Sequence, residues 1–333
     1  MHNIPRRGQL GLTAAVALVV AIATAGSAAA TPPTGSSSVG ADTLTVVGTQ
    51  RVDRLALRLA PGDPNTLQVD FDDDGSVDQS FNRTTFTHIE VFLGNGDDHV
   101  RVDQTNGAFA DDPVTVDAGR GDDTIATGDG TDVVLGGNGD DTFDGNRGAD
   151  TAVLGSGEDT FIWDAGDGSD AVDGGAGGDT LVFNGSAQNE VMSLSANGRS
   201  SLFLRDPGGI RMDMRDVEVL DLAALDGADT ITVNDLSSST FREANIDLAV
   251  SGATDRQADV VTVNGSDAAD TISVQADGPQ VEVDGLTSDT RLSGTEAIDR
   301  LQVNSAGGND VVDVDPDAGA LITITVDLGS GQL

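Results

Sequence analysis

Aspartates recur at a fixed spacing in the middle of this 333-residue chain, and carboxylate oxygens are ligands that hard cations prefer. From residue 118 the sequence can be written in rows of nine, and the sixth position of every row is aspartate. One slip of two residues, at Trp163-Asp164, interrupts the array. The aspartates of this column are Asp123, Asp132, Asp141, Asp150, Asp159, Asp170 and Asp179. The spacing predicts a series of oxygen ligands for divalent cations.

Two other columns of the array are equally regular. The fourth position of every row is glycine, and the eighth is apolar, from Ile125 to Leu181. Glycine supplies the left-handed backbone that tight turns require, and we expect the apolar residue to point inward, into a thin core. The glycines that we single out beside the aspartates are Gly119, Gly121, Gly130, Gly137, Gly139, Gly148 and Gly157.

This array resembles the RTX (haemolysin-type) calcium-binding repeat, G-G-x-G-x-D-x-U-x. The resemblance covers residues 118–182 and implies an all-β fold: a right-handed parallel β-roll/β-helix solenoid with calcium-binding turns. In that family the first six residues of a repeat form a turn, the last three form a strand, and two repeats complete one coil. Several Ca²⁺ ions lie between stacked turns, held by the aspartates and by glycine-rich turn backbone.

Carried over to this chain, the resemblance distributes the aspartates between two edges of the solenoid. Asp123, Asp141 and Asp159 stack along one edge, and Asp132 and Asp150 along the other. Asp170 and Asp179 continue this pattern only if the Trp163-Asp164 insertion bulges out.

Stacked aspartates repel one another unless a cation lies between them. Neighbouring rungs of a sheet are about 4.8 Å apart, so each pair of charges repels by about 3.5 kcal/mol at an effective dielectric of 20 and about 0.9 kcal/mol in bulk water. A divalent cation turns this repulsion into attraction. We therefore expect the array to fold only with calcium; a metal-free β-solenoid with Gly-Asp turns is the alternative.

Three longer segments around the array align with one another, at residues 43–103, 180–235 and 260–315. Each holds four or five short alternating strands broken by Gly/Asp turns. We interpret them as wider coils of the same solenoid, with separate small β-domains as the alternative. The predicted boundaries are an N-terminal β-solenoid unit with one RTX-like turn at 43–117, the RTX β-roll at 118–182, a β-solenoid unit at 183–259 and a C-terminal one at 260–333.

Each longer segment ends in a sequence close to one nonapeptide. Leu93–Arg101 fits the repeat well, which makes Asp98 a further candidate calcium ligand. Leu225–Val233 and Ala306–Val314 fit less well, so we interpret Asp229 and Asp310 as ordinary turn residues.

One other acidic motif lies outside the array. Residues 70–78 fit the first nine positions of an EF-hand-type loop, with Gly75 at the turn. The candidate ligands are Asp70, Asp72, Asp74 and Asp78. The twelfth position, normally glutamate, is Phe81, and the flanking residues read as strands of a hairpin, so an acidic hairpin turn is the alternative to a calcium site.

The N-terminus has the pattern of a secretory signal peptide. Arg6 and Arg7 precede an apolar stretch, Leu10–Ala25, and we predict cleavage after Ala30, followed by a flexible leader at 31–42. A membrane anchor, the alternative, needs about twenty apolar residues. We therefore expect a secreted, extracellular protein with no membrane span after cleavage.

Composition excludes several classes of protein. The formal charge is −39, from 17 basic against 56 acidic residues, and every basic residue is arginine. A nucleic-acid partner would require a basic surface, which this chain lacks. Without cysteine there is no disulfide framework, and without lysine there is no Walker loop.

The favoured function is a secreted calcium-binding protein of RTX type that acts as a structural, cell-surface or interaction module. A cell-surface polysaccharide or a protein is the partner class that suits such a module. We expect no catalysis, because HExxH and G-x-S-x-G motifs are absent and His88 and His99 lie in a strand and a turn. The alternatives are a β-helical polysaccharide-degrading enzyme, lyase or hydrolase, and a salt-adapted protein whose acidity serves hydration.

Overall fold

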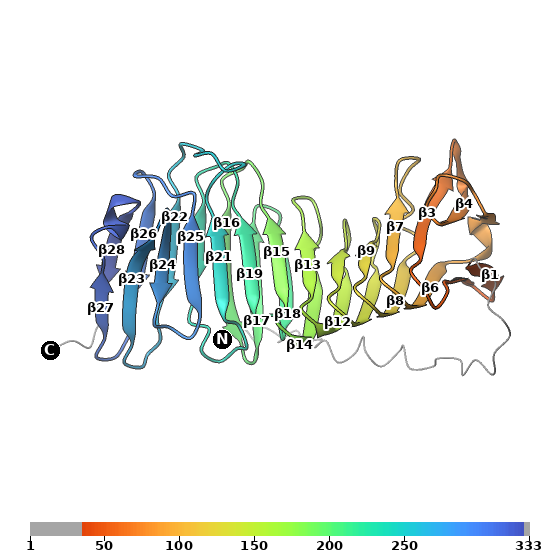
Figure 1. Cartoon of the computed structure of the whole chain (residues 1–333). Coiled ribbons are helices and arrows are strands. Elements are labelled where there is room, and N and C mark those ends of the chain that lie inside the picture. Colours follow the sequence, from red (N-terminus) through yellow and green to blue (C-terminus); the bar gives the residue numbers. More distant parts are fainter. Residues whose placement is uncertain (1–34, 330–333) are drawn as a thin grey trace, which may run out of the picture. The chain divides into compact units, whose positions relative to one another are not determined.

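The computed structural model describes residues 35–329, which form two sheets of fourteen strands each (Figure 1). Sheet A contains, in spatial order, β1 (Ser36–Gly40), β2 (Thr43–Val47), β6 (His88–Asn95), β8 (Val114–Arg120), β10 (Val133–Asn138), β12 (Thr151–Gly157), β14 (Ala171–Gly177), β18 (Ile210–Arg215), β17 (Ser200–Asp206), β16 (Val191–Asn197), β20 (Thr230–Val233), β22 (Val260–Asn264), β26 (Arg300–Asn304) and β28 (Thr323–Asp327). Sheet B contains β27 (Val311–Val314), β23 (Thr271–Asp277), β24 (Gln280–Asp284), β25 (Asp289–Ser293), β21 (Glu243–Asp247), β19 (Val219–Ala223), β15 (Thr180–Asn184), β13 (Thr160–Trp163), β11 (Thr142–Asp144), β9 (Thr124–Ala126), β7 (His99–Asp103), β3 (Arg54–Ala60), β4 (Asp63–Phe71) and β5 (Gln79–Asn82). In this part of the chain the helical segments are two 3₁₀ turns, η3 (Arg83–Thr85) and η4 (Ala318–Ala320).

The central array forms a regular parallel solenoid. From β8 to β15 the chain alternates between sheet A and sheet B, and each strand pairs in parallel with the next strand of its own sheet. Val133 of β10 lies opposite Thr151 of β12, and Thr142 of β11 lies opposite Thr160 of β13. One coil therefore contains two nonapeptides, and the prediction of an all-β solenoid of the β-roll type is confirmed.

The two kinds of strand in the array differ in length. Sheet B strands such as β9 and β11 contain three residues, whereas sheet A strands such as β12 contain up to seven. The sheet A strands continue into the first residues of the following nonapeptide. The expected pattern, a turn of six residues followed by a strand of three, therefore holds on the sheet B side of the coil but not on the sheet A side.

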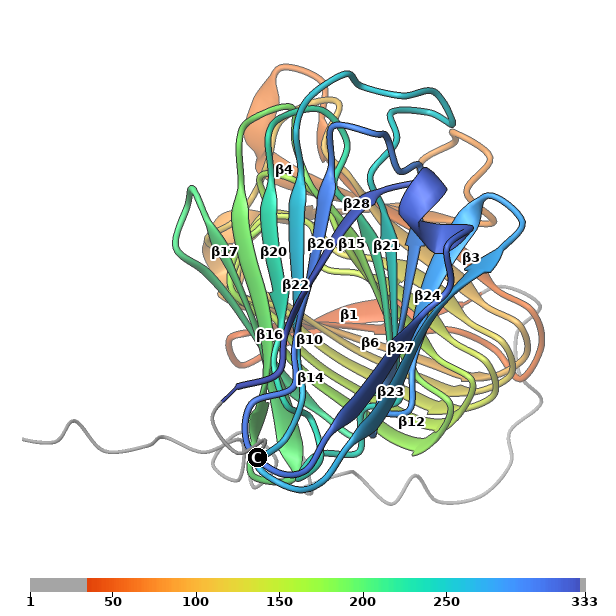
Figure 2. The ribbon, with the colours of Figure 1, turned by 90° about the vertical axis from the view of Figure 1, so that its left-hand side faces the viewer.

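The longer segments contribute their strands to the same two sheets. Their extra residues form antiparallel excursions within a sheet: β3–β4–β5 and β23–β24–β25 in sheet B, and β16–β17–β18 in sheet A. The first and last strands of the sheet A excursion pair in parallel with the neighbouring coils, β16 with β20 and β18 with β14. Viewed along the stack in Figure 2, the last strands of sheet A (β22, β26 and β28) lie opposite those of sheet B (β23, β24 and β27).

The core lies between the two sheets and is thinnest in the array. Sheet A provides Val134, Ala152 and Val172 there, while sheet B provides larger residues such as Phe143 and Phe161. The rings of Phe143 and Phe161 meet edge to face, with their centroids 5.1 Å apart. Such a shallow core leaves the stability of these coils dependent on their turns.

Trp163 corrects one expectation. The Trp163-Asp164 insertion does not bulge out as a unit, because Trp163 ends β13, is fully buried and stacks on Phe183 with the ring centroids 4.0 Å apart. The following turn accommodates the additional length, and its first residue, Asp164, donates its main-chain N–H to Asp167 Oδ2. Asp170 keeps its place before β14 because a longer turn leaves the strand register unchanged.

The predicted leader also differs in part. The signal peptide at 1–30 and the first residues of the leader lie outside the described residues, but residues 36–40 form β1, which pairs antiparallel with β2. Pairing satisfies the main-chain groups of β2 that would otherwise remain open at the edge of sheet A.

Candidate calcium-binding turns

The aspartates of the sixth column all occupy one place in the coil, directly before a strand, and all are buried. Their exposed fractions run from 0% for Asp159 and Asp179 to 4% for Asp170. Aspartate is almost never fully buried unless its charge is compensated by hydrogen bonds, an ion pair or a metal. The atoms around each carboxylate therefore indicate what the turns bind.

One row of these aspartates, which we call the first ladder, precedes strands of sheet B. It consists of Asp98, Asp123, Asp141, Asp159 and Asp179. Oδ1 of each residue after Asp98 accepts a hydrogen bond from the main-chain N–H of the residue one coil earlier, at distances of 2.7, 2.8, 2.8 and 3.0 Å. Asp98, the first member, accepts in the same way from the N–H of Asp53, at 2.7 Å from Oδ1.

A second ladder precedes strands of sheet A, at the opposite edge of the coil. It consists of Asp132, Asp150 and Asp170. The N–H of Asp132 donates to Asp150 Oδ1 at 2.7 Å, and that of Asp150 donates to Asp170 Oδ1 at 2.8 Å. The spacing is 18 residues in the first step and 20 in the second, because the longer turn after Trp163 lies between them.

The other carboxylate oxygen, Oδ2, has no hydrogen-bond partner in most of these residues. It is buried and unpartnered in Asp98, Asp123, Asp132, Asp141, Asp150, Asp159 and Asp179. Leaving a charged oxygen buried and unpaired costs more than the roughly 1–3 kcal/mol of a neutral polar group. A cation beside each Oδ2 would remove this cost, so the residues present fit bound calcium.

Burial also shifts the protonation of the ladders. Desolvation, aided by repulsion between neighbouring aspartates, raises the pKa of Asp141 to about 7 and that of Asp150 to about 8. Desolvation likewise raises the pKa of Asp98 to about 7 and that of Asp159 above its ordinary value. It raises the pKa of four further ladder residues to about 6: Asp123, Asp132, Asp170 and Asp179. Protons and calcium thus compete for the same oxygens near neutral pH.

Carboxylates alone do not complete these sites. Within residues 35–329 no three acidic or histidine side chains come together where they could hold one ion. Calcium takes about six to eight oxygen ligands, so turn carbonyls must supply the remainder. The backbone is close enough between coils for this arrangement: a Cβ added to Gly137, at φ +115°, would lie 2.2 Å from the carbonyl oxygen of Gly119.

Gly148 is required for a different reason than we expected. Left-handed backbone is present at the other singled-out glycines, namely Gly119, Gly121, Gly130, Gly137, Gly139 and Gly157. Gly148 does not adopt a positive φ, yet a Cβ there would lie 1.6 Å from the carbonyl oxygen of Gly130. The close approach of successive turns, rather than handedness, excludes a side chain at this position.

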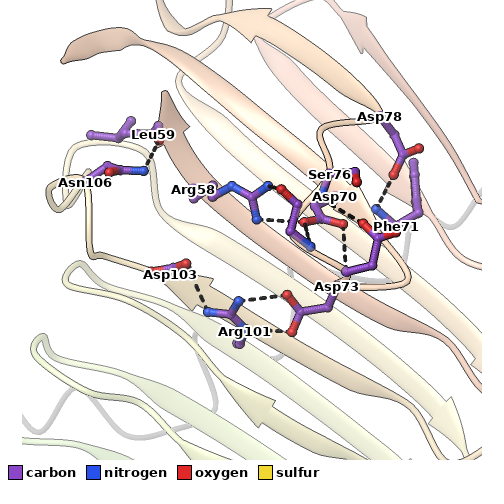
Figure 3. A network of polar contacts seen from close by, with 12 residues as sticks. Arg58, Leu59, Asp70, Phe71, Asp73, Ser76, Asp78, Arg101, Asp103 and Asn106 are labelled. Atoms are coloured by element: carbon purple, nitrogen blue, oxygen red, sulfur yellow. Dashed lines mark hydrogen bonds and ion pairs between the residues drawn. The ribbon is translucent and has the colours of Figure 1, made fainter. Parts of the chain in front are cut away.

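The EF-hand-type loop is occupied by the protein's own donors (Figure 3). Asp70 Oδ2 accepts a hydrogen bond from Arg58 Nη1 at 2.7 Å and another from the N–H of Gly75 at 3.0 Å. Asp78 Oδ2 accepts from the N–H of Phe71 at 2.8 Å. The arginine already neutralises the buried carboxylate, so we leave Asp70, Asp72, Asp74 and Asp78 out of the calcium proposal below.

A third ladder escaped the sequence analysis. It consists of Glu190, Asp229, Asp259 and Asp299, each directly before a strand of sheet A. The N–H of each of the first three donates to a carboxylate Oδ1 of the next, at 2.7, 2.8 and 3.1 Å. Asp229 is 1% exposed, and its Oδ2 is buried and unpartnered.

The signal for Asp229 was present in the sequence but in a shifted register. Gly227, at φ +131°, stands two residues before Asp229, and the buried Ile231 stands two residues after it. These are columns four, six and eight of a nonapeptide that begins at residue 224, one residue earlier than the alignment considered above. Asp259 and Asp299 could not be recognised from the sequence, because they follow the preceding member of the ladder by 30 and 40 residues instead of a multiple of nine.

The RTX calcium-binding nonapeptide repeat family matches this chain in four copies, over residues 115–143 and 127–161. The array therefore contains RTX calcium-binding repeats, as the spacing of its aspartates and glycines indicated. No curated protein matches the chain.

Among solved structures, the extracellular lipase LipA from Serratia marcescens is similar over 66% of this chain and 45% of that chain, with 13% sequence identity and a TM-score of 0.20. The match thus spans less than half of the lipase, and similarity at this level says nothing about activity. In residues 35–329 no helix has the length and apolar character that crossing a bilayer demands.

Proposed function

We propose that this protein is exported and binds several calcium ions in its array, which becomes ordered when they bind. The observation that carries this proposal is the row of buried Oδ2 atoms without a partner in seven aspartates. The proposed ligands are these oxygens in the first and second ladders, the carboxylate of Asp170 and carbonyls of the glycine-rich turns.

Calcium titration of the chain that begins at Thr31 tests this proposal. Far-UV circular dichroism should show the β-structure of the array appearing with calcium and disappearing with EDTA, while isothermal titration gives the number of ions. Magnesium should be a poor substitute, because it requires near-ideal octahedral geometry at shorter distances. A spectrum that is the same in EDTA and in calcium would refute coupled folding.

Sodium chloride at matched ionic strength separates calcium binding from general salt adaptation. Screening by monovalent salt weakens repulsion between exposed charges but acts much less on buried ones. If sodium chloride alone restored the β-structure, the acidity of the chain would serve hydration, and the ligand assignment would be wrong.

The calcium requirement suits an extracellular module. Extracellular calcium modules bind at about 10⁻⁴–10⁻³ M, so the array would remain unfolded until export. Export is supported by the signal-peptide pattern at residues 1–30, and mass spectrometry of the secreted protein should find Thr31 at the N-terminus. We propose a structural or cell-surface role, tested by calcium-dependent retention on the producing cells and release by EDTA.

A further inference from the structure

A groove crosses the outer face of sheet B, over strands β15, β19, β21 and β25, which lie side by side in Figure 1. It extends from Val182 of β15 to Arg291 of β25, and Gln280, the first residue of β24, also lines it. Its volume is about 290 Å³, near the lower limit of the roughly 300–1,000 Å³ that is usual for small-molecule sites. The groove therefore has room for a small ligand or for a short segment of a polymer.

Strand register arranges the lining of the groove in two rows. Leu222, Ile246 and Leu292 are buried in the core, and because successive side chains of a strand point to opposite faces, their neighbours along each strand point outward. The two rows run from β19 through β21 to β25 and consist of Asp221, Asn245 and Arg291 in the first, and of Ala223, Asp247 and Ser293 in the second. A ligand in the groove would thus contact polar side chains from three adjacent strands.

Hydrogen bonds hold the acidic side chains of both rows in place. Asn245 donates its side-chain N–H to Asp221 Oδ1 at 2.8 Å, and the main-chain N–H of Ala249 donates to Asp247 Oδ1 at 3.1 Å. In both aspartates Oδ2 has no hydrogen-bond partner among residues 35–329, and neither oxygen is enclosed. Two oriented acceptors are therefore available to a ligand.

Arg291 adds donors to the first row. Its Nη1 forms an ion pair with Glu243, and its Nε donates to Glu282 Oε1 at 3.1 Å. These two contacts fix the plane of the guanidinium, and Nη2 has no partner within the described part of the chain, so its N–H groups remain for a ligand. Acceptors and a fixed donor in one small groove suit hydroxyl groups, which both donate and accept.

Charge narrows the class of ligand further. Asp221 and Asp247 line the groove, and Glu243 and Glu282 lie beside it, so four carboxylates face a single guanidinium, that of Arg291. Juxtaposed like charges oppose binding, which disfavours phosphates and acidic sugars. The guanidinium, in turn, disfavours a densely cationic ligand. A neutral ligand rich in hydroxyl groups remains.

The groove also has apolar surface between its polar groups. Val182 of β15 lies opposite Asp221, and Asn184 lies opposite Ala223, so Val182 and Ala223 are diagonal neighbours on adjacent strands. Both are half-buried and line the groove. A sugar ring carries C–H groups on its faces and hydroxyl groups around its edge, and this pattern matches apolar residues set beside polar ones.

We propose that this groove binds a neutral oligosaccharide segment of a cell-surface polysaccharide. Such binding deepens the proposed cell-surface role, and it rests on that role for the source of the ligand. None of the described residues that line the groove is aromatic. Aromatic side chains dominate the energetics of many interfaces, so we expect a dissociation constant in the millimolar range.

Saturation-transfer NMR, which detects millimolar binding, tests the groove in the chain that begins at Thr31, at saturating calcium. The neutral probes are hexasaccharides of glucose, mannose, galactose, xylose and arabinose. A galacturonic acid hexamer is the anionic probe, and hexalysine is the cationic one. At least one neutral hexasaccharide should bind, and neither charged probe should.

Two variants place the binding in the groove. A223F fills the apolar part of the lining and should weaken binding of the neutral hexasaccharide at least about tenfold. D247N keeps an oxygen for the N–H of Ala249 but replaces the free acceptor by a donor, so it should weaken binding about threefold to tenfold, the effect of one hydrogen bond. The matched control is A171F, the same change on the outer face of sheet A, and it should bind like the wild type.

The outcomes distinguish this site from the calcium sites. Isothermal titration should count as many calcium ions in A223F as in the wild type. If no neutral hexasaccharide binds, if a charged probe binds instead, or if A223F leaves the binding unchanged, the groove assignment is wrong and the calcium array stands. A wild type that binds a hexasaccharide but no calcium contradicts the calcium proposal alone. Should circular dichroism show that A223F does not fold, D247N decides, and wild-type affinity there overturns the site.

Discussion

The two oxygens of each ladder aspartate have different roles. In Asp141, Oδ1 fixes the N–H of Asp123 in the preceding coil, while Oδ2 is buried without a partner. An asparagine can perform the first role, because its amide oxygen also accepts a hydrogen bond, but not the second. Substitution by asparagine therefore separates the structural contribution of the residue from its contribution to ion binding.

We expect D141N to weaken calcium binding at its turn about tenfold or more, a loss of at least about 1.4 kcal/mol. The same change should stabilise the calcium-free chain, because it removes a buried charge that Asp123 and Asp159 repel. Isothermal titration and thermal melting with and without EDTA measure both effects. The control is D140N, which changes the exposed neighbour. Equal affinities in the two variants would contradict the assignment.

Protonation should stabilise the calcium-free ladders. The pKa of Asp150 rises from its ordinary 3.8 to about 8 in the folded chain, so the folded state holds a proton that the unfolded state releases. The free energy of unfolding in calcium-free buffer should therefore fall as the pH rises from about 4 to about 8. Urea unfolding at pH 5 and pH 8 tests the sign, and greater stability at pH 8 would refute it.

Calcium should displace these protons. Titration at pH 5, where protonation favours folded calcium-free ladders, in two buffers of different ionisation enthalpy should give different apparent binding enthalpies, because the released protons protonate the buffer. Identical enthalpies in the two buffers would mean that no proton is released.

Sequence alone grouped the column-six aspartates, which share one buried place before a strand, because their neighbours repeat in register. It missed Asp259 and Asp299 because a loop precedes the first and the β23–β24–β25 excursion precedes the second, and the lengths of these segments do not repeat. It could not show that Asp70 pairs with Arg58, because Arg58 lies on the adjacent antiparallel strand and a linear motif does not show cross-strand neighbours.

At the scale of the elements, the turns depend on backbone passing very close to backbone. G137A should destabilise the array by about 1–3 kcal/mol, because it combines a positive φ with a contact of 2.2 Å to a carbonyl oxygen. G178A should change stability by less than about 0.5 kcal/mol, because no atom lies within 4 Å of its added Cβ. Thermal melting in calcium compares the two variants, and equal midpoints would show that the turns tolerate a side chain.

The strands could be predicted well where the nine-residue period is strict, and less well in the longer segments, where it is interrupted. Alternating apolar residues indicated short strands in the longer segments, and these strands are present. The positions of β17 and β24 within a sheet, each between two antiparallel partners, could not be predicted from the sequence, because alternation does not reveal which strand is the partner. Trp163 is buried because its indole stacks on Phe183, a contact with the next coil of sheet B.

At the scale of the described molecule, a shallow array lies between segments with larger cores. Phe203 and Phe241 are fully buried on one side of it, and Leu55 and Leu57 are buried on the other. A solenoid is stabilised by contacts between adjacent coils, so loss of order in the middle uncouples its two parts.

Removing calcium should therefore split the unfolding of the chain into more than one transition. Trp163, the single tryptophan, lies in the array and reports its order by fluorescence, whereas far-UV circular dichroism reports all strands. In EDTA the fluorescence of Trp163 should already report a disordered array at temperatures below the main loss of ellipticity. In saturating calcium the two curves should coincide. Coincident curves in EDTA would show that the array does not depend on calcium.

The hydrogen bonds of the ladders connect one turn to the next, and this affects how occupancy spreads. An ion that fixes one carboxylate also fixes the amide of the preceding coil, whose own carboxylate is then already oriented for the following ion. Calcium binding at successive turns should therefore be cooperative and give a sigmoidal isotherm. Such a chain responds to a narrow interval of calcium concentration as a switch, and the number of stacked turns determines how steep that switch is.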